Sequence, residues 1–146
     1  MQPFPHQYRV SASAAPEGDV TLSGDRLPDL ASAPPAEFDG PGDRWSPETL
    51  LVASIADCFI LTFRSIATIA KLRWFSLACE VHGTVERVDR VTQFTAFTLH
   101  ARLGVAPGAD HEQARRLLDK AEAGCLVSNS LKPAIHLESD VRTMDA

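Results

Sequence analysis

The stretch SPETLLVASIADCFILTF, residues 46–63, decides the fold. It opens with Ser46, a good N-cap, then Pro47, which suits the first helical position, and Glu48, which favours the positive end of the helix dipole. The pattern predicts a helix from Ser46 to about Leu72. Its apolar residues point nearly all round the helix axis: Leu50, Leu51, Val52, Ile55, Cys58, Phe59, Leu61, Phe63, Ile66 and Ile69. Such a helix is buried on most sides, so we expect it at the centre of the fold.

Two strand patterns follow this helix. In SLACEVHGTVERVD, residues 76–89, and in FTAFTLHARLGV, residues 94–105, apolar and polar side chains alternate. Each strand therefore has one buried and one wet face, as strands of antiparallel sheets do. Cys79 falls on a buried face, which indicates core packing. His82 and His100 fall on polar faces, and we interpret both as solvated.

The rest of the chain completes an α+β domain. YRVSASA and DVTLSGD, within residues 8–25, predict an N-terminal hairpin, and Pro28–Trp45 has the composition of a long loop. Asp110 resembles the start of a capping box, and a helical stripe from there ends near Gly124. A final strand is expected at about 134–142. We predict a single domain, residues 1–146, in which an antiparallel sheet covers one long buried helix and one shorter helix.

Composition excludes several classes of protein. The 146 residues are 45% hydrophobic and 23% charged, with a net charge of -5 that argues against nucleic-acid binding. The N-terminus shows no signal peptide, and the apolar stretch Leu50–Ala70 contains Asp57 and Arg64, which favours a core helix over a membrane span. Three cysteines without a signal peptide suggest a reducing compartment. We therefore expect a cytoplasmic protein with no membrane and no nucleic-acid partner.

Cys58 and Cys125 are the candidates for chemistry. Spacing alone leaves open both a redox pair and two unrelated core residues. A zinc site is the poorer interpretation, since the chain lacks a Cys-x-x-Cys or His-x-x-x-His arrangement. A redox cysteine needs a cation or hydrogen-bond donor to hold it as thiolate, and a resolving thiol nearby.

Glu48 raises a question of geometry. It precedes Cys58 by ten residues, which is about 15 Å of helical rise and far beyond hydrogen-bond reach. If Glu48 serves the site of this sulfur, it comes from a second subunit or the chain bends back there. A first-turn acid that satisfies the helix dipole is an adequate alternative.

The helix stretch, followed by GCLVSNSL at residues 124–131, resembles the OsmC/Ohr family of osmotically induced and organic-hydroperoxide-resistance proteins. The resemblance covers most of the chain. It implies an OsmC-like fold in which antiparallel sheets wrap around the long central helices of an intertwined homodimer, with thiol-peroxidase sites at the subunit interface. It also implies that Cys58 is the peroxidatic cysteine, that Cys125 is the resolving cysteine, and that Glu48 fixes an activating arginine.

The chain departs from the best-known members of this family in two places. Leu126 follows the second cysteine where the family commonly has proline. Glu37 stands in AEFDGPGDRW where several members carry arginine. The activating cation is therefore unassigned by the resemblance. Arg44 is the first candidate because it lies close to Glu48 in sequence, and Arg26 and Arg9 follow it.

The leading hypothesis is a dimeric thiol peroxidase that reduces organic hydroperoxides. Cys58 would become a sulfenic acid and then form a disulfide with Cys125, which an external dithiol reductant would reduce. No metal or other cofactor is needed. The alternative is a non-enzymatic OsmC-fold protein that binds a small apolar ligand or senses redox state. A third possibility is that both cysteines are inert core residues.

Overall fold

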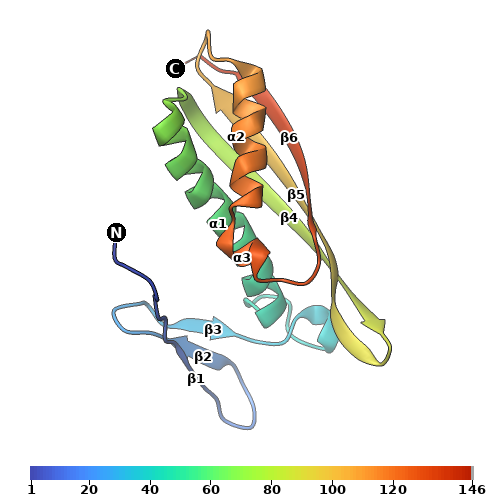
Figure 1. Cartoon of the computed structure of the whole chain (residues 1–146). Coiled ribbons are helices and arrows are strands. Elements are labelled where there is room, and N and C mark those ends of the chain that lie inside the picture. Colours follow the sequence, from blue (N-terminus) through green and yellow to red (C-terminus); the bar gives the residue numbers. More distant parts are fainter. Residues whose placement is uncertain (146) are drawn as a thin grey trace. The chain divides into compact units, whose positions relative to one another are not determined.

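The computed structural model describes residues 1–145, and its longest element is the predicted central helix, α1, Pro47–Ala70 (Figure 1). The backbone N–H of Thr49 donates to Ser46 Oγ at 3.1 Å, and the N–H of Ser46 donates to Thr49 Oγ1 at 2.8 Å. This reciprocal pair is a capping box with threonine at its third position, and it fixes the start of the helix. Lys71, in the left-handed region at φ 57°, follows its last residue.

The burial of α1 differs from the prediction. Its buried residues form one stripe at every fourth position: Ile55, Phe59, Phe63 and Ala67. Leu61 and Ile69 are 52% and 82% exposed. The expectation that the helix is buried nearly all round is therefore wrong within one chain, because the chain covers only a single face of it. The length and mean hydropathy of α1, 1.8, would also suit a membrane span, but its buried stripe is typical of a core helix.

The chain clusters into two compact units, Met1–Leu51 and a second from Val52 onward, and the division falls within α1. The second unit contains a three-stranded sheet in the order β4-β5-β6. Strands β4, Trp74–Val88, and β5, Val91–Val105, form an antiparallel hairpin. Asp89 and Arg90 both have positive φ in its two-residue turn, as the favoured hairpin turns require.

Strand β6, Ile135–Thr143, makes this sheet mixed. It pairs with β5 in parallel, from Phe97 opposite Ile135 to Val105 opposite Thr143. The prediction of a wholly antiparallel sheet is therefore wrong at β6. The reason is the connection: a helical crossover returns the chain to the end of the sheet where β5 began, so the next strand runs in the same direction.

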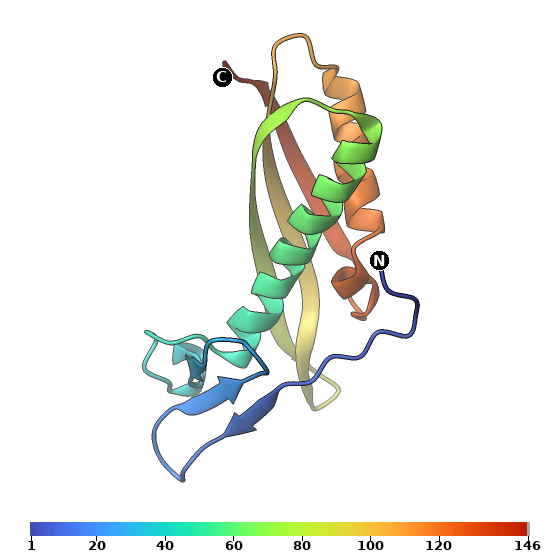
Figure 2. The same cartoon turned by 90° about the vertical axis from the view of Figure 1, so that its left-hand side faces the viewer.

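Helices cover one face of this sheet. Helix α2, His111–Ala123, begins at Asp110, whose carboxylate accepts from the N–H groups of Glu112 and Gln113. Figure 2 shows α1 and α2 on the same side of the sheet. Strand β5 contributes the buried residues Phe97, Leu99, Ala101 and Leu103 to the core. The predicted stripe of α2 is confirmed as buried at Ala114, Leu117, Leu118 and Ala121. A one-turn helix, α3, Leu126–Asn129, then precedes β6 and was not predicted.

The first unit contains a small antiparallel sheet in the order β1-β2-β3. Strands β1, Ser11–Ser13, and β2, Val20–Ser23, confirm the predicted hairpin. The expected loop at 28–45 is only partly irregular, since it contains β3, Leu30–Ser32, and a short 3-10 helix, η1, Ala36–Phe38. β3 was not predicted because three residues are too few to show the alternation of apolar and polar side chains that marks a strand, and the stretch around it is rich in proline.

Candidate thiol site

The structure brings Cys58 and Cys125 together, although they lie far apart in the sequence. Cys58 is half-buried in the middle of α1, and Cys125, only 1% exposed, is the N-cap residue of α3. The side chain of Cys125 hydrogen-bonds to that of Cys58. Both thiols are free. Two reduced thiols in contact form a pair that oxidation can join.

The break between α2 and α3 positions Cys125. The N–H of Cys125 donates to Glu122 O at 3.1 Å, and Asn129 Nδ2 donates to Ala123 O at 3.1 Å. These bonds tie α3 to the end of α2. A Cβ on Gly124 would lie 3.8 Å from Cγ2 of Thr62, so this turn also packs closely against α1.

Several hydrogen-bond donors converge on Cys58. They are the backbone N–H groups of Leu126 and Val127, the thiol of Cys125, and the hydroxyl of Thr62, whose Oγ1 lies 3.9 Å from Cys58 Sγ. Burial acts to raise the pKa of Cys58 and is the largest single effect. The donors together outweigh it, led by Val127 and Cys125, so the pKa of Cys58 lies below its ordinary value.

The pKa of Cys125 shifts in the opposite direction. Burial raises it first, and the neighbouring Cys58 raises it further, while the hydroxyl and N–H of Ser128 oppose the shift only in part. The Ser128 hydroxyl is buried and has no conventional hydrogen-bond partner within residues 1–145, so its main neighbour is this sulfur. Cys58 therefore ionises first, and Cys125 stays protonated and donates to it.

Cys79 lies on β4 opposite Ala101, half-buried on the face that carries the core. Burial, together with the charge of Cys125, raises the pKa of Cys79 to about 11. It is therefore a protonated thiol at neutral pH, in agreement with its interpretation as a packing residue. His82 and His100 belong to the other face of the sheet. His82 is exposed, and His100 is half-buried with its Nδ1 2.9 Å from Glu138 Oε2.

Arg44 and Glu48 belong to the first unit. Arg44 Nε donates to Asp19 Oδ2 at 3.0 Å, and Nη1 lies 3.4 Å from Asp43 Oδ2. The hydrogen bond and charge of Asp19, followed by the charge of Asp43, raise the pKa of Arg44. Glu48 is not among its ion-pair partners in the described part of the chain, where the buried Oε1 of Glu48 has no hydrogen-bond partner.

A family model described as OsmC-like protein matches residues 40–140, which include both site cysteines. The chain belongs to the OsmC-like protein family. It is 29% identical over 109 residues to an uncharacterized Bacillus subtilis protein, YmaD, and the match covers 71% of each chain.

Solved structures show the same OsmC-like fold. An OsmC-like protein of unknown function from Vibrio cholerae matches with a TM-score of 0.86 at 15% identity, covering 93% of this chain and 100% of that one. An organic hydroperoxide resistance protein from Legionella pneumophila matches with a TM-score of 0.74 at 24% identity, covering 95% and 98%. At these identities the matches establish the fold.

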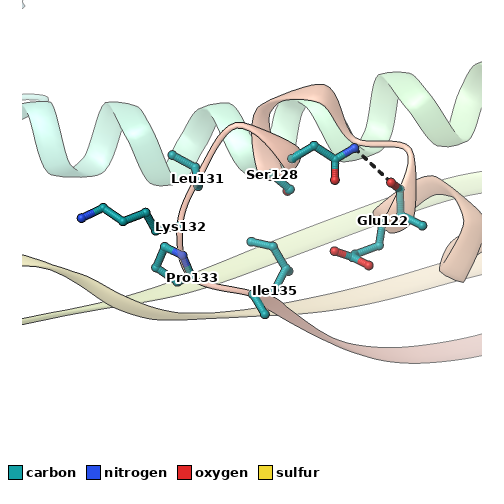
Figure 3. Close-up of a pocket in the computed structure, with 9 residues that line it drawn as sticks. Glu122, Ser128, Leu131, Lys132, Pro133 and Ile135 are labelled. Atoms are coloured by element: carbon teal, nitrogen blue, oxygen red, sulfur yellow. Dashed lines mark hydrogen bonds between the residues drawn. The ribbon is translucent and has the colours of Figure 1, made fainter.

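A surface pocket lies beside Ser128, the neighbour of Cys125, although neither cysteine lines it. Its volume is ≈ 400 Å³, and it lies between the end of α2, α3 and the segment that leads into β6 (Figure 3). Glu122 lines it, with a pKa raised by burial and then by Asp119. Ser128 lines it too and also neighbours Cys125. The lining residues are Glu122, Ala123, Ser128, Asn129, Leu131, Lys132, Pro133, Ala134 and Ile135.

The sequence analysis did not predict the hydrogen-bond donors around Cys58. Thr62 follows Cys58 by four residues, a spacing that places the two on one helix face. The helix break at Gly124, with Ser128 and Asn129 shortly after it, could have indicated a new helix start with free N–H groups. Which amides face Cys58, however, depends on how α3 approaches α1, and no local pattern reports that.

Proposed function

We propose that this protein is a cytoplasmic, thiol-dependent peroxidase that reduces organic hydroperoxides to alcohols. The observation that carries the proposal is the asymmetry of the thiol pair. Cys58 has a lowered pKa, which suits a nucleophile, and Cys125, with a raised pKa, touches it as a protonated thiol. This is the arrangement that a peroxidatic cysteine and its resolving partner need.

The reaction runs in two steps. The Cys58 thiolate attacks the terminal oxygen of the hydroperoxide, the O–O bond breaks, and the alkoxide that leaves takes a proton to become the alcohol. Cys58 is then a sulfenic acid. The sulfur of Cys125 attacks the sulfur of Cys58, hydroxide leaves and is protonated to water, and a disulfide remains. An external dithiol supplies the two electrons that restore both thiols.

Family membership supports this chemistry. The family includes organic hydroperoxide resistance proteins, as the Legionella pneumophila structure of the same fold illustrates. Neither step calls for a metal or another cofactor. The apolar residues of α1 near the sulfur favour lipophilic peroxides over hydrogen peroxide as substrates.

The active form is proposed to be a homodimer. Leu61 and Ile69 leave an apolar face of α1 exposed in the single chain, and a second copy would cover it. The buried, unpaired Oε1 of Glu48 calls for a donor, and the proposed role of Glu48 is to orient an activating arginine. Arg44 is the first candidate for that arginine, followed by Arg26 and Arg9.

Peroxide consumption tests the proposal. The purified protein is given an organic hydroperoxide, such as tert-butyl hydroperoxide, with a dithiol in excess, and loss of peroxide is followed against a Cys58→Ser control. Turnover that depends on Cys58 supports the peroxidase. Absence of turnover with every dithiol supports the alternative, an OsmC-fold protein that binds a small apolar ligand or senses redox state through the same thiols.

A further inference from the structure

The two sulfurs of the thiol pair differ in their access to solvent. Cys125 is only 1% exposed and is one of the fully buried side chains of the core. Cys58 is half-buried. A thiol that reduces a disulfide attacks one of its two sulfurs, and access is one of the factors that decide which. The oxidised pair of the proposed function would therefore offer one sulfur to an external thiol and enclose the other.

We propose that the external thiol reductant attacks the sulfur of Cys58, not that of Cys125, and reaches it through the opening that admits the hydroperoxide. This inference rests on the proposed function, whose disulfide it needs, and specifies how that disulfide is reduced. Because Cys58 must meet the peroxide in the active protein, a path to this sulfur exists in whatever assembly the protein adopts. No step of the reaction requires such a path to Cys125.

The reduction runs through a mixed disulfide. The thiolate of the reductant attacks Cys58 Sγ, a bond forms between these two sulfurs, and the bond from Cys58 to Cys125 breaks. The electron pair of the broken bond leaves on Cys125, which takes up the proton that the reductant's first thiol has lost. The second thiol of the reductant then attacks the reductant's own sulfur in the mixed disulfide and releases Cys58 as thiolate. The dithiol has supplied two electrons and ends as a disulfide.

Backbone hydrogen bonds hold Cys125 in its buried position. Its N–H donates to Glu122 O at 3.1 Å, at the end of α2, and its carbonyl accepts from Asn129 N at 2.9 Å, in α3. Asn129 Nδ2 also donates to Ala123 O at 3.1 Å. Disulfide formation rotates side chains and leaves these bonds in place. The sulfur of Cys125 therefore stays enclosed in the oxidised protein.

The open approach to Cys58 lies on the side of Leu61. Leu61 and Thr62 follow Cys58 by three and four residues, so they flank it on the surface of α1. The turn that carries Cys125 covers the Thr62 side, where a Cβ on Gly124 would lie 3.8 Å from Thr62 Cγ2. Leu61, on the other side, is 52% exposed. A thiolate attacks a disulfide from the side opposite the leaving sulfur, and for Cys58 this is the open side.

The leaving group favours the opposite choice. The sulfur whose thiol has the lower pKa leaves faster. The pKa of Cys58 lies below its ordinary value and that of Cys125 lies above it, so leaving-group chemistry alone would direct the attack to Cys125 and expel Cys58. Leaving-group acidity changes the rate of an attack only where the nucleophile can reach the sulfur. We therefore expect access to decide, and the two factors make opposite predictions that an experiment can separate.

Sulfite tests the proposal in the full chain and without peroxide. Diamide first joins Cys58 to Cys125, and sulfite then cleaves the bridge, so that one sulfur becomes a stable S-sulfonate and the other leaves as a thiol. After desalting in acid, N-ethylmaleimide labels the released thiol. The three cysteines fall in separate tryptic peptides, because Arg64, Arg73 and Lys120 lie between them. Mass spectrometry of these peptides shows which sulfur was attacked.

We expect nearly all of the S-sulfonate on Cys58 and nearly all of the N-ethylmaleimide on Cys125 in the native protein. In guanidinium chloride, where unfolding exposes both sulfurs, the S-sulfonate should divide between the two peptides. S-sulfonate mainly on Cys125 in the native protein, or the same division before and after unfolding, would overturn the proposal. Failure of diamide to join the two cysteines would overturn it too.

Cys79→Ser is the matched control, because it removes the third thiol and with it any exchange of the bridge through Cys79. It should give the wild-type distribution, and a shift of the S-sulfonate to Cys125 in this variant would count against the proposal. The result is independent of turnover. If sulfite attacks Cys58 but no dithiol supports peroxide consumption, the proposed peroxidase fails and the assignment of the attacked sulfur stands. If the protein is a peroxidase and sulfite attacks Cys125, only the route of reduction is wrong.

Discussion

The side chain of Cys125 donates a hydrogen bond to that of Cys58, and the two thiols have pKa values shifted in opposite directions. The contact favours one microstate, in which Cys58 is the anion and Cys125 keeps the proton. The pair is thus divided into a nucleophile and a partner before any oxidant arrives.

Cys58→Ser should abolish peroxide reduction and leave the fold intact, because oxygen replaces sulfur at nearly the same volume and a serine hydroxyl does not ionise at neutral pH. Peroxide consumption with an excess of dithiol measures it. Cys79→Ser, a second cysteine replacement outside the thiol pair, should retain most of the activity. Appreciable turnover in Cys58→Ser would remove Cys58 from the role of nucleophile.

Cys125→Ser should permit the first oxidation but block recycling by disulfide formation. Without the resolving thiol, the sulfenic acid of Cys58 persists and oxidises further to the sulfinic acid. Mass spectrometry after one equivalent of peroxide should find a Cys58–Cys125 disulfide in the wild type and an over-oxidised Cys58 in the variant. A bridge from Cys58 to Cys79 in the wild type would mean that the resolving residue is wrongly assigned.

Arg44→Met tests the proposed activating cation. If the arginine acts on Cys58 in the assembled protein, the apparent pKa of this thiol should rise and the peroxidase rate at neutral pH should fall. Loss of the pairs with Asp19 and Asp43 should change the stability of the fold little, because solvent screens exposed ion pairs. Alkylation rates across pH measure the thiol. A titration curve like that of the wild type would reassign the cation to Arg26 or Arg9.

The protein should be a homodimer at micromolar concentration. The exposed apolar face of α1 around Leu61 and Ile69 is the surface that a second copy would bury. Leu61→Asp should weaken association, measured by analytical ultracentrifugation, because dimer formation would then bury a charge. Arg116→Asp, at an exposed position on α2, is the control and should not. A stable wild-type monomer would contradict this prediction.

Cys79 should make the stability of the fold fall in alkaline solution. Its pKa is raised from 9.0 to about 11, so the folded state favours the protonated thiol. The resulting stabilisation is complete below pH 9 and is lost as the pH rises from 9 to about 11. Denaturant unfolding across this range measures it. Cys79→Ala should show a smaller decline, and an equal decline in both proteins would argue against a perturbed Cys79.

Local sequence was enough for the elements that local physics determines. Ser46 and Pro47 predicted where α1 begins, and the observed capping bonds explain why. The apolar stripe of α2 was likewise readable from its spacing, because helix periodicity depends on neighbours three and four residues apart. Short elements such as β3 and α3 were not predicted, because three or four residues are too few to show a periodic pattern.

The tertiary structure decided what depends on distant segments. The sequence carried the two cysteines and the family resemblance, but only the path of the chain after α2 makes β6 parallel to β5 and brings α3 against α1. That approach places the thiol of Cys125 and the amides of Leu126 and Val127 on Cys58. A lowered pKa at an apolar helix position cannot be inferred from the helix itself, because its own burial acts in the opposite direction and the compensating donors come from elsewhere in the fold.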